Sequence, residues 1–142
     1  KCSFEGIDNP NDPIIFEKNS LWWLIFTDEF KNNEMFIFYS NSPLDNNWIP
    51  HKLNPVLINQ KYSRNGGFIK HNDYSYRVAQ SPGFNNYGKS ISLMLIEELT
   101  PNTYSEKNVE NIYPYYDKKI KGIHTISKNS EFTVFDFWKL IR

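Results

Sequence analysis

The feature that most constrains the fold is an internal repeat. The segment IIFEKNSLWWLIFT at 14–27 aligns with GFIKHNDYSYRVAQ at 67–80, which begins 53 residues further along the chain. Each copy has an apolar pair, a short polar stretch with a shared Asn, and then an aromatic run. A weaker copy, HTISKNSEFTVFDF at 124–137, lies 110 residues after the first. A period near 55 residues is typical of propellers and solenoids, in which each repeat is one supersecondary unit.

Composition and pattern together predict an all-β fold. Aromatic residues make up 17% of the 142 residues and Ala occurs once, at Ala79, a bias that favours strands over helices. Turn-forming residues separate the apolar runs of the first repeat, so this repeat is predicted to be a four-stranded meander, the unit of a propeller blade. Its predicted strands are 14–18, 21–28, 34–41 and 48–52, with a turn at Asn19 and Ser20.

The strands of the repeats also indicate how the sheets pack. LWWLIFT and MFIFYS in the first repeat are apolar without interruption, so both faces of these strands must be covered, as happens when blades stack face to face. A third repeat begins near Gly122 and has two recognisable strands. The predicted strands of the second repeat are 67–72, 74–81 and 89–97, with an outer segment at 104–113.

We therefore expect a single domain, residues 1–142, that is a β-propeller fragment of about two and a half four-stranded blades. The blades are predicted at 12–54 and 64–114, with a partial blade at 122–142. Propellers close with roughly four to eight blades. The remaining blades are thus expected elsewhere in the parent chain or in a partner.

Charge and cysteine content exclude several classes of function. Sixteen basic and sixteen acidic residues cancel, and without a basic excess the chain is not expected to bind nucleic acid. No apolar run approaches the roughly 18 residues of a membrane span. A single cysteine, Cys2, precludes an internal disulfide and a cysteine metal cluster, and we expect no metal site and no cofactor. Scarce cysteine is also typical of a reducing compartment, from which we expect a cytoplasmic location.

One stretch matches a nucleotide-binding motif. GFNNYGKS at 83–90 fits the P-loop pattern G-x-x-x-x-G-K-[ST], which cradles phosphate only between a strand and a helix. The neighbouring segments resemble aromatic hairpins, and Ile91, Leu93 and Leu95 alternate as they would in a strand. We therefore expect a hairpin loop with glycines here and no nucleotide site.

Three polar residues lie where the first strands of the three repeats begin. Asp12 precedes a proline, and by local chemistry alone it is a turn-former that accepts backbone N–H bonds. Arg64 and His124 occupy similar places in the second and third repeats. Innermost strands of a propeller point into its axial cavity, so the three side chains are expected to converge on one pocket. Such a set suits a polyhydroxylated or anionic ligand, because Arg binds carboxylates and phosphates well.

Three further residues are candidates for a supporting role in ligand binding. Arg77 and Gln80 follow the second strand of their blade and either support the pocket or form a buried polar pair satisfied by backbone carbonyls. Tyr87 lies in the loop with glycines and is positioned either to stack on a sugar ring or to cover its own blade. His124 is alternatively a structural hydrogen-bonding residue.

The order of these motifs resembles a known family. The series DPIIF, WW-L-x-F-T, R-x-GGFI, YR-x-AQ, IEELTP and GIHTI is similar to the N-terminal propeller domain of glucosamine inositolphosphorylceramide transferases. The resemblance runs from about Asp8 to Val134, in the later part of that domain. It implies a five-bladed propeller akin to family 43 glycoside hydrolases, whose innermost strands carry paired catalytic acids.

The resemblance implies a role for Asp12 and limits it. Asp12 matches the position of a catalytic base or nucleophile, yet the openings of the other repeats carry Arg64 and His124 in place of further acids. In the transferases, the transfer chemistry is attributed to a separate domain. The resemblance therefore implies a propeller that recognises a glycan or a sugar phosphate.

We accordingly interpret the chain as a carbohydrate- or sugar-phosphate-recognising module, accessory to a glycan-modifying transferase. Its partners would be that ligand and the remaining blades or a fused transferase domain. One alternative is an active propeller that uses Asp12 in glycoside hydrolysis or glycosyl transfer. Another is a structural propeller that serves protein interaction.

Overall fold

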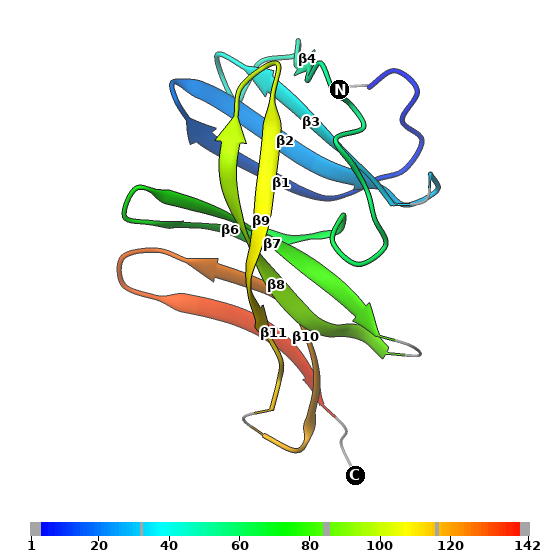
Figure 1. Cartoon of the computed structure of the whole chain (residues 1–142), viewed down its shortest axis with the longest axis vertical. Helices are drawn as coiled ribbons and strands as arrows, with labels where there is room; N and C mark the ends of the chain where they lie inside the picture. The colour runs from blue at the N-terminus through cyan, green and yellow to red at the C-terminus, as the bar shows by residue number, and fades with distance from the viewer. Residues whose placement is uncertain (1–3, 32, 84–85, 116, 140–142) are drawn as a thin grey trace.

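The described part of the chain is all-β (Figure 1). The computed structural model describes residues 4–31, 33–83, 86–115 and 117–139, and for residues 83, 86 and 87 it describes the backbone alone. These residues form eleven strands in three antiparallel sheets, and no helix. Within the same ranges, no segment therefore has the helical length and hydropathy required to cross a membrane.

The first sheet is the meander that the first repeat predicts, with one addition. Its strands lie in the order β1-β2-β3-β4, and β5 also pairs with β3. Asn19 and Ser20 both have positive φ, 54° and 61°, as the two-residue turn between β1 and β2 requires. The bounds are β1 Pro10–Lys18, β2 Leu21–Asp28, β3 Glu34–Ser40, β4 Ile49–Pro50 and β5 Leu57–Ile58.

The fourth strand is shorter than predicted, and a side chain takes part in the pairing beyond it. The backbone N–H of His51 still donates to the carbonyl of Ile37 in β3 at 3.0 Å, and beyond it the amide of Asn54 also pairs with the backbone of Ile37. The N–H of Ile37 donates to Asn54 Oδ1 at 2.9 Å, and Asn54 Nδ2 donates to the carbonyl of Ile37 at 2.7 Å. The side-chain amide thus accepts the Ile37 N–H in place of a strand carbonyl and adds a second donor to the Ile37 carbonyl.

The second sheet contains a long hairpin at the place where the sequence matches the nucleotide-binding motif. It has the order β6-β7-β8-β9, and β8 is a 14-residue strand. A strand at 89–97 excludes the P-loop, which needs a helix there. The hairpin loop expected in GFNNYGKS is also shorter than predicted, because β7 and β8 continue their ladder to the Gly83–Asn86 pair. The bounds are β6 Asn65–His71, β7 Tyr74–Gly83, β8 Asn86–Leu99 and β9 Tyr104–Ile112.

The third sheet contains two strands of the described residues, β10 (Ile120–Lys128) and β11 (Thr133–Lys139). Figure 1 shows the three sheets following one another along the long axis of the molecule. The first strands of the sheets are neighbours, since β6 contacts both β1 and β10. The rings of Phe16 in β1 and Phe68 in β6 stack at 4.0 Å between centroids.

Two apolar clusters hold the sheets together. The larger one joins Phe16, Trp23, Ile25, Met35 and Ile37 of the first sheet to the end of β8. The smaller one joins the second sheet to Ile123 of β10. The larger cluster covers one face of β2 and β3. On the opposite face Phe26 and Phe38 are buried beside Phe4, whereas Trp22, Leu24 and Phe36 are partly buried.

Between the second and third sheets, the backbones themselves are in contact. A Cβ atom added at Gly66 would lie 2.3 Å from the carbonyl oxygen of His124, and one at Gly67 would lie 2.3 Å from that of Ile126. Real Cβ atoms are not found at such distances, so these positions of β6 require glycine. The pair of glycines therefore sets how closely β10 approaches β6.

We predict that Gly66→Ala lowers the free energy of unfolding by about 3 kcal/mol, because the new methyl group overlaps a backbone carbonyl that has little room to move. The control is Gly6→Ala, where nothing lies within 4 Å and only the left-handed φ of 72° opposes the change. That control is expected to cost about 1 kcal/mol. Urea unfolding of both variants measures the difference, and equal losses would contradict the packing argument.

Candidate functional site

The candidate site is built on β-bulges that lie at one end of the three first strands. In β1, Asp12 and Pro13 together oppose Phe26, and in β10, His124 and Thr125 together oppose Asp136. In β6, one extra residue, Gly66, lies between two paired positions. Bulges bend a strand and redirect its side chains, and they are frequent beside functional sites. Asp12 and His124 therefore hold equivalent places in their hairpins, as the sequence predicts, whereas Arg64 lies one residue before Asn65, the matching position in the second sheet.

Asp12 and Arg64 form a direct ion pair across the first and second sheets. Asp12 Oδ2 accepts from Arg64 Nε at 3.0 Å and from an Arg64 terminal nitrogen at 2.9 Å. The backbone of Asp12 has a φ of 51°, and its carbonyl accepts from Asn65 Nδ2 at 3.0 Å. The structure thus brings Asp12 and Arg64, two of the three predicted pocket residues, together.

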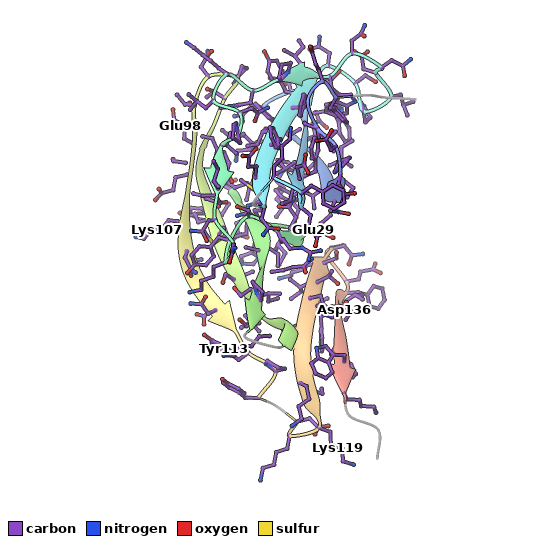
Figure 2. All side chains as sticks on the ribbon, turned by 90° about the vertical axis from the view of Figure 1, so that its right-hand side faces the viewer. Glu29, Glu98, Lys107, Tyr113, Lys119 and Asp136 are labelled. Carbon is purple, nitrogen blue, oxygen red and sulfur yellow. The ribbon has the colours of Figure 1, made fainter. Side chains whose placement is uncertain are left out.

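Glu29 adds a second carboxylate to this pair. Its Oε1 lies 3.9 Å from an Arg64 terminal nitrogen, and its Oε2 accepts from Asn11 Nδ2 at 3.2 Å. We call Asn11, Asp12, Glu29 and Arg64 the Arg64 cluster. Figure 2 shows Glu29 near the middle of the molecule, above Asp136 of the third sheet. Side-chain exposure is 19% for Arg64, 26% for Asp12 and 50% for Glu29, so a ligand can reach the cluster.

The Arg64 cluster presents hydrogen-bond donors and acceptors side by side. Carboxylates accept from hydroxyl groups, and the guanidinium and amide donate to oxygen. The cluster carries one positive charge, on Arg64, and two negative charges, on Asp12 and Glu29. The cluster as a whole therefore does not favour a strongly anionic ligand. Its chemistry suits the hydroxyl groups of a sugar better than a phosphate.

His124 lies beside this cluster through its backbone, but its ring points elsewhere. Its carbonyl oxygen packs against Gly66, two residues after Arg64, as described above. A Cβ atom at Gly88 would lie 1.8 Å from His124 Cδ2, so the imidazole lies directly over Gly88 of β8. Its Nδ1 is 3.2 Å from Asp136 Oδ2. The imidazole thus contacts both β8 and β11.

Asp136 fixes the bulge in which His124 lies. Asp136 Oδ1 accepts from the backbone N–H groups of His124 at 3.0 Å and of Thr125 at 2.7 Å. Partial burial opposes the charged form, but the hydrogen bonds from the Thr125 and His124 backbone and from the imidazole outweigh it and lower the pKa of Asp136. The carboxylate of Asp136 therefore stabilises the bulge in its charged form.

Arg77 is fully buried, and a network of polar groups satisfies it. Its guanidinium donates to the Glu106 carboxylate at 2.8 and 2.6 Å and to the carbonyl of Tyr62 at 2.7 Å. The Tyr104 hydroxyl donates to Glu106 at 2.5 Å. Burial opposes the charge on Arg77, but the Glu106 carboxylate raises the pKa of the guanidinium above its ordinary value. Burial raises the pKa of Tyr104, which keeps its hydroxyl proton as a donor.

Asn65 connects this buried network to the Arg64 cluster. Arg77 donates to Asn65 Oδ1 at 3.1 Å, and Gln80 Nε2 donates to the carbonyl of Asn65 at 2.5 Å. Asn65 Nδ2 in turn donates to the carbonyls of Asp12 and Ile25. Arg77 and Gln80 are therefore placed to hold Asn65, and through it the bulge at Asp12.

Several residues of this arrangement were not foreseen in the sequence. The 53-residue offset maps Asp12 onto Asn65, a signal that was present in the repeat. The sequence pattern does not indicate a role for Glu29 or Asp136, because the position of each side chain depends on the strand register at a bulge. The side chain of Tyr87 lies outside the described residues. Among the described residues, no three His, Cys, Asp or Glu side chains group closely enough to hold a metal ion.

Comparison with known proteins places this chain in a family. A sequence profile described as "Glucosamine inositolphosphorylceramide transferase 1, N-terminal" matches residues 9–131. The chain is 40% identical over 106 residues to glucosamine inositolphosphorylceramide transferase 1 of Arabidopsis thaliana, which covers 69% of this chain and 14% of that protein. It is 40% identical over 111 residues to the proteins of that name in Oryza sativa subsp. japonica and subsp. indica, which covers 70% of this chain and 14% of each. No solved structure matches the chain significantly.

We predict that Arg77→Met lowers the free energy of unfolding by about 3–5 kcal/mol, because it leaves the Glu106 carboxylate buried without its partner. The double variant Arg77→Met with Glu106→Gln is expected to lose less, since no buried charge remains. Thermal and urea unfolding of the single and double variants provide the measurement. A double variant less stable than Arg77→Met would contradict the role assigned to the ion pair.

We predict that Asp136→Asn weakens the dependence of stability on acid pH. The folded-state pKa of Asp136 lies below its ordinary value near 4, so its contribution is present above that value and is lost as pH falls through the folded-state pKa. Urea midpoints of the parent protein should therefore fall more steeply from about pH 5 to about pH 2 than those of the variant. Glu131→Gln, in the loop of the same hairpin, is the matched control, and parallel curves for the parent and Asp136→Asn would refute the assignment.

Proposed function

The chain belongs to the family of glucosamine inositolphosphorylceramide transferase N-terminal domains, and on this premise we propose that it is a carbohydrate-recognising module, accessory to a glycan-modifying transferase. The chain spans 14% of the length of the relatives it matches, so the transfer reaction itself is assigned to the larger protein. The ligand of the module is a sugar or sugar phosphate.

The observation that carries this proposal is the Arg64 cluster. It combines a guanidinium, two carboxylates and an amide in a partly exposed position at the junction of two sheets. Vicinal hydroxyl groups of a sugar ring each both donate and accept, so they match alternating acceptors and donors. The bulge and the buried contacts of Asn65 hold Asp12 in place before a ligand arrives, which reduces the entropic cost of binding.

The wider architecture is proposed to be a five-bladed propeller with further blades in the parent chain. Successive antiparallel sheets with adjoining first strands β1, β6 and β10 support this proposal. The third sheet also exposes the apolar side chains of Val134 and Phe137. A neighbouring blade or a fused domain that packs on β11 would cover them.

Glycoside hydrolysis is the second candidate, and Glu29 is the observation that favours it. Glu29 and Asp12 contact the same guanidinium, so two carboxylates are close enough to share a substrate. However, Arg64 already donates two hydrogen bonds to Asp12 Oδ2, and a nucleophile or base would have to leave that pair first. Binding therefore accounts for the arrangement more directly than catalysis does.

We predict that Arg64→Ala weakens binding of the preferred sugar about tenfold or more, because it removes charge-assisted hydrogen bonds and frees the Asp12 carboxylate from its fixed position. Calorimetric titration of the intact protein with neutral hexoses, amino sugars and hexose phosphates provides the measurement. Lys70→Ala, at the other end of β6, is the control and should bind as the parent does.

Two outcomes would decide against the proposal. Binding that is unchanged in Arg64→Ala would remove the Arg64 cluster from ligand recognition. Turnover of aryl glycosides that is lost in Asp12→Asn but retained in Lys70→Ala would support the hydrolase in its place.

A further inference from the structure

The sequence contains one Asn-Gly pair, and the fold places it where β6 meets the first and third sheets. Among the Asn residues of the chain, Asn65 alone is followed by glycine, at Gly66. The backbone nitrogen after an Asn can attack the side-chain amide carbon, and glycine hinders this attack least because it has no Cβ atom. In the unfolded chain, Asn65 is therefore the Asn most prone to lose its amide group as ammonia.

The folded structure restrains the side chain of Asn65 against this reaction. Asn65 is 1% exposed, and its amide donates to the carbonyls of Asp12 at 3.0 Å and of Ile25 at 3.3 Å. Its Oδ1 accepts from Arg77 at 3.1 Å. To form a ring with its own backbone, the amide has to leave these partners. It is thus held by groups of both the first and the second sheet.

The attacking group is restrained as well. A Cβ atom added at Gly66 would lie 2.3 Å from the carbonyl oxygen of His124 in β10. It would also lie 3.2 Å from side-chain atoms of Val78 and Gln80 in β7. The backbone at Gly66 is therefore enclosed by neighbouring strands and has little room to rotate. Ring formation requires these neighbours to move apart.

Loss of the amide would remove the group that aligns the sheets. A carboxylate at position 65 has no donor for the carbonyls of Asp12 and Ile25, so unpaired oxygen atoms would face one another in a buried place. Arg77 offsets the new charge only in part, because Glu106 already accepts two of its hydrogen bonds, at 2.8 and 2.6 Å. An isoaspartate at this position would also lengthen the backbone of β6 and disturb its ladder.

We propose that Asn65–Gly66 is a latent deamidation site, closed by the packing of the three sheets and opened by their separation. In the open chain, the Gly66 nitrogen forms a bond to Asn65 Cγ. The side-chain nitrogen leaves as ammonia and carries away the proton that Gly66 gives up. Water then adds to a carbonyl carbon of the cyclic imide and opens the ring, which yields isoaspartate or Asp.

The reaction makes opening of the fold irreversible. Water is its only co-reactant, so it proceeds whenever the sheets are apart for long enough, and the product lacks the amide that the folded state requires. No ligand takes part, so the site does not depend on the proposed function.

Residue-resolved mass spectrometry tests when the site opens. The intact protein is incubated at neutral pH, either folded in buffer or unfolded in guanidinium chloride. Conversion is followed at Asn65 and at Asn41, an exposed Asn that precedes Ser42. Asn65 is expected to react faster than Asn41 in the unfolded chain, and about a hundredfold or more slower in the folded protein than in the unfolded chain. Equal rates for Asn65 in the two states would overturn the proposal, as would an unfolded chain in which Asn65 reacts no faster than Asn41.

Two variants separate the packing from the chemistry. Leu99→Ala removes a buried side chain through which β8 packs on the first sheet, and Leu99 takes no part in the hydrogen bonds of Asn65 given above. Under folding conditions this variant should convert Asn65 about tenfold faster or more, with Asn41 unchanged, because the open state is more populated. Gly66→Ala should slow conversion severalfold in the unfolded chain, where packing plays no part. An unchanged rate in either variant contradicts the proposal.

Refolding tests the consequence of the reaction. After partial conversion in guanidinium chloride, the fraction of chains that no longer regains the parent's urea midpoint should equal the fraction converted at Asn65. Asn65→Asp, which supplies the product directly, should unfold at lower urea concentration than the parent or fail to fold, whereas Asn41→Asp should unfold as the parent does. An Asn65→Asp variant as stable as the parent would overturn the proposal, since opening would then have no lasting effect. These readouts are masses and unfolding midpoints, so a failure of sugar binding leaves them unchanged.

Discussion

The arrangement depends on one buried side chain, the amide of Asn65. It donates to two carbonyls of the first sheet and accepts from Arg77 of the second, while its own carbonyl accepts from Gln80. An unsatisfied amide in the same place would cost about 1–3 kcal/mol, so the two sheets can meet here only in the one alignment that satisfies all of these groups. Apolar contacts bring the sheets together, and Asn65 determines their relative position.

This alignment also explains why the exposed polar residues gather at one end of the strands. Each first strand carries its extra residue at the same end, so the ladders are interrupted where the sheets adjoin. Where a ladder is interrupted, backbone N–H and C=O groups lose their partners in the neighbouring strand. The side chains of Asn65 and Asp136 make hydrogen bonds to these groups instead. The side chains of Asp12 and Arg64 are thereby left to face each other at the surface. Polar groups that maintain the fold and polar groups that can meet a ligand are thus adjacent parts of one network.

The sequence predicts the sheets more fully than the site because the two depend on different information. Apolar runs and turn residues are local signals, so the hairpin at Asn19 and Ser20 and the strand at 89–97 could be inferred directly. The repeat led us to expect Asp12 and Arg64 near each other, but the ion pair between them was not predicted. Glu29 and Asp136 could not be inferred, because a one-residue bulge changes which side chains face each other across a ladder. The direction of the His124 ring was equally hidden, since it depends on the space above Gly88.

The amide of Asn54 on β3 has a consequence for the behaviour of the protein in concentrated solution. The outer side of β3 is paired piece by piece, with β4 at Phe38 and Tyr39, Asn54 at Ile37, and β5 at Glu34 and Met35. An open strand edge of apolar residues such as EMFIFYS would be a template on which other chains could add strands. The irregular segment that follows β3 pairs with that edge through short stretches only. These stretches are too short to serve as a template for a further strand. A repeat unit rich in aromatic strands is in this way protected from edge-to-edge aggregation.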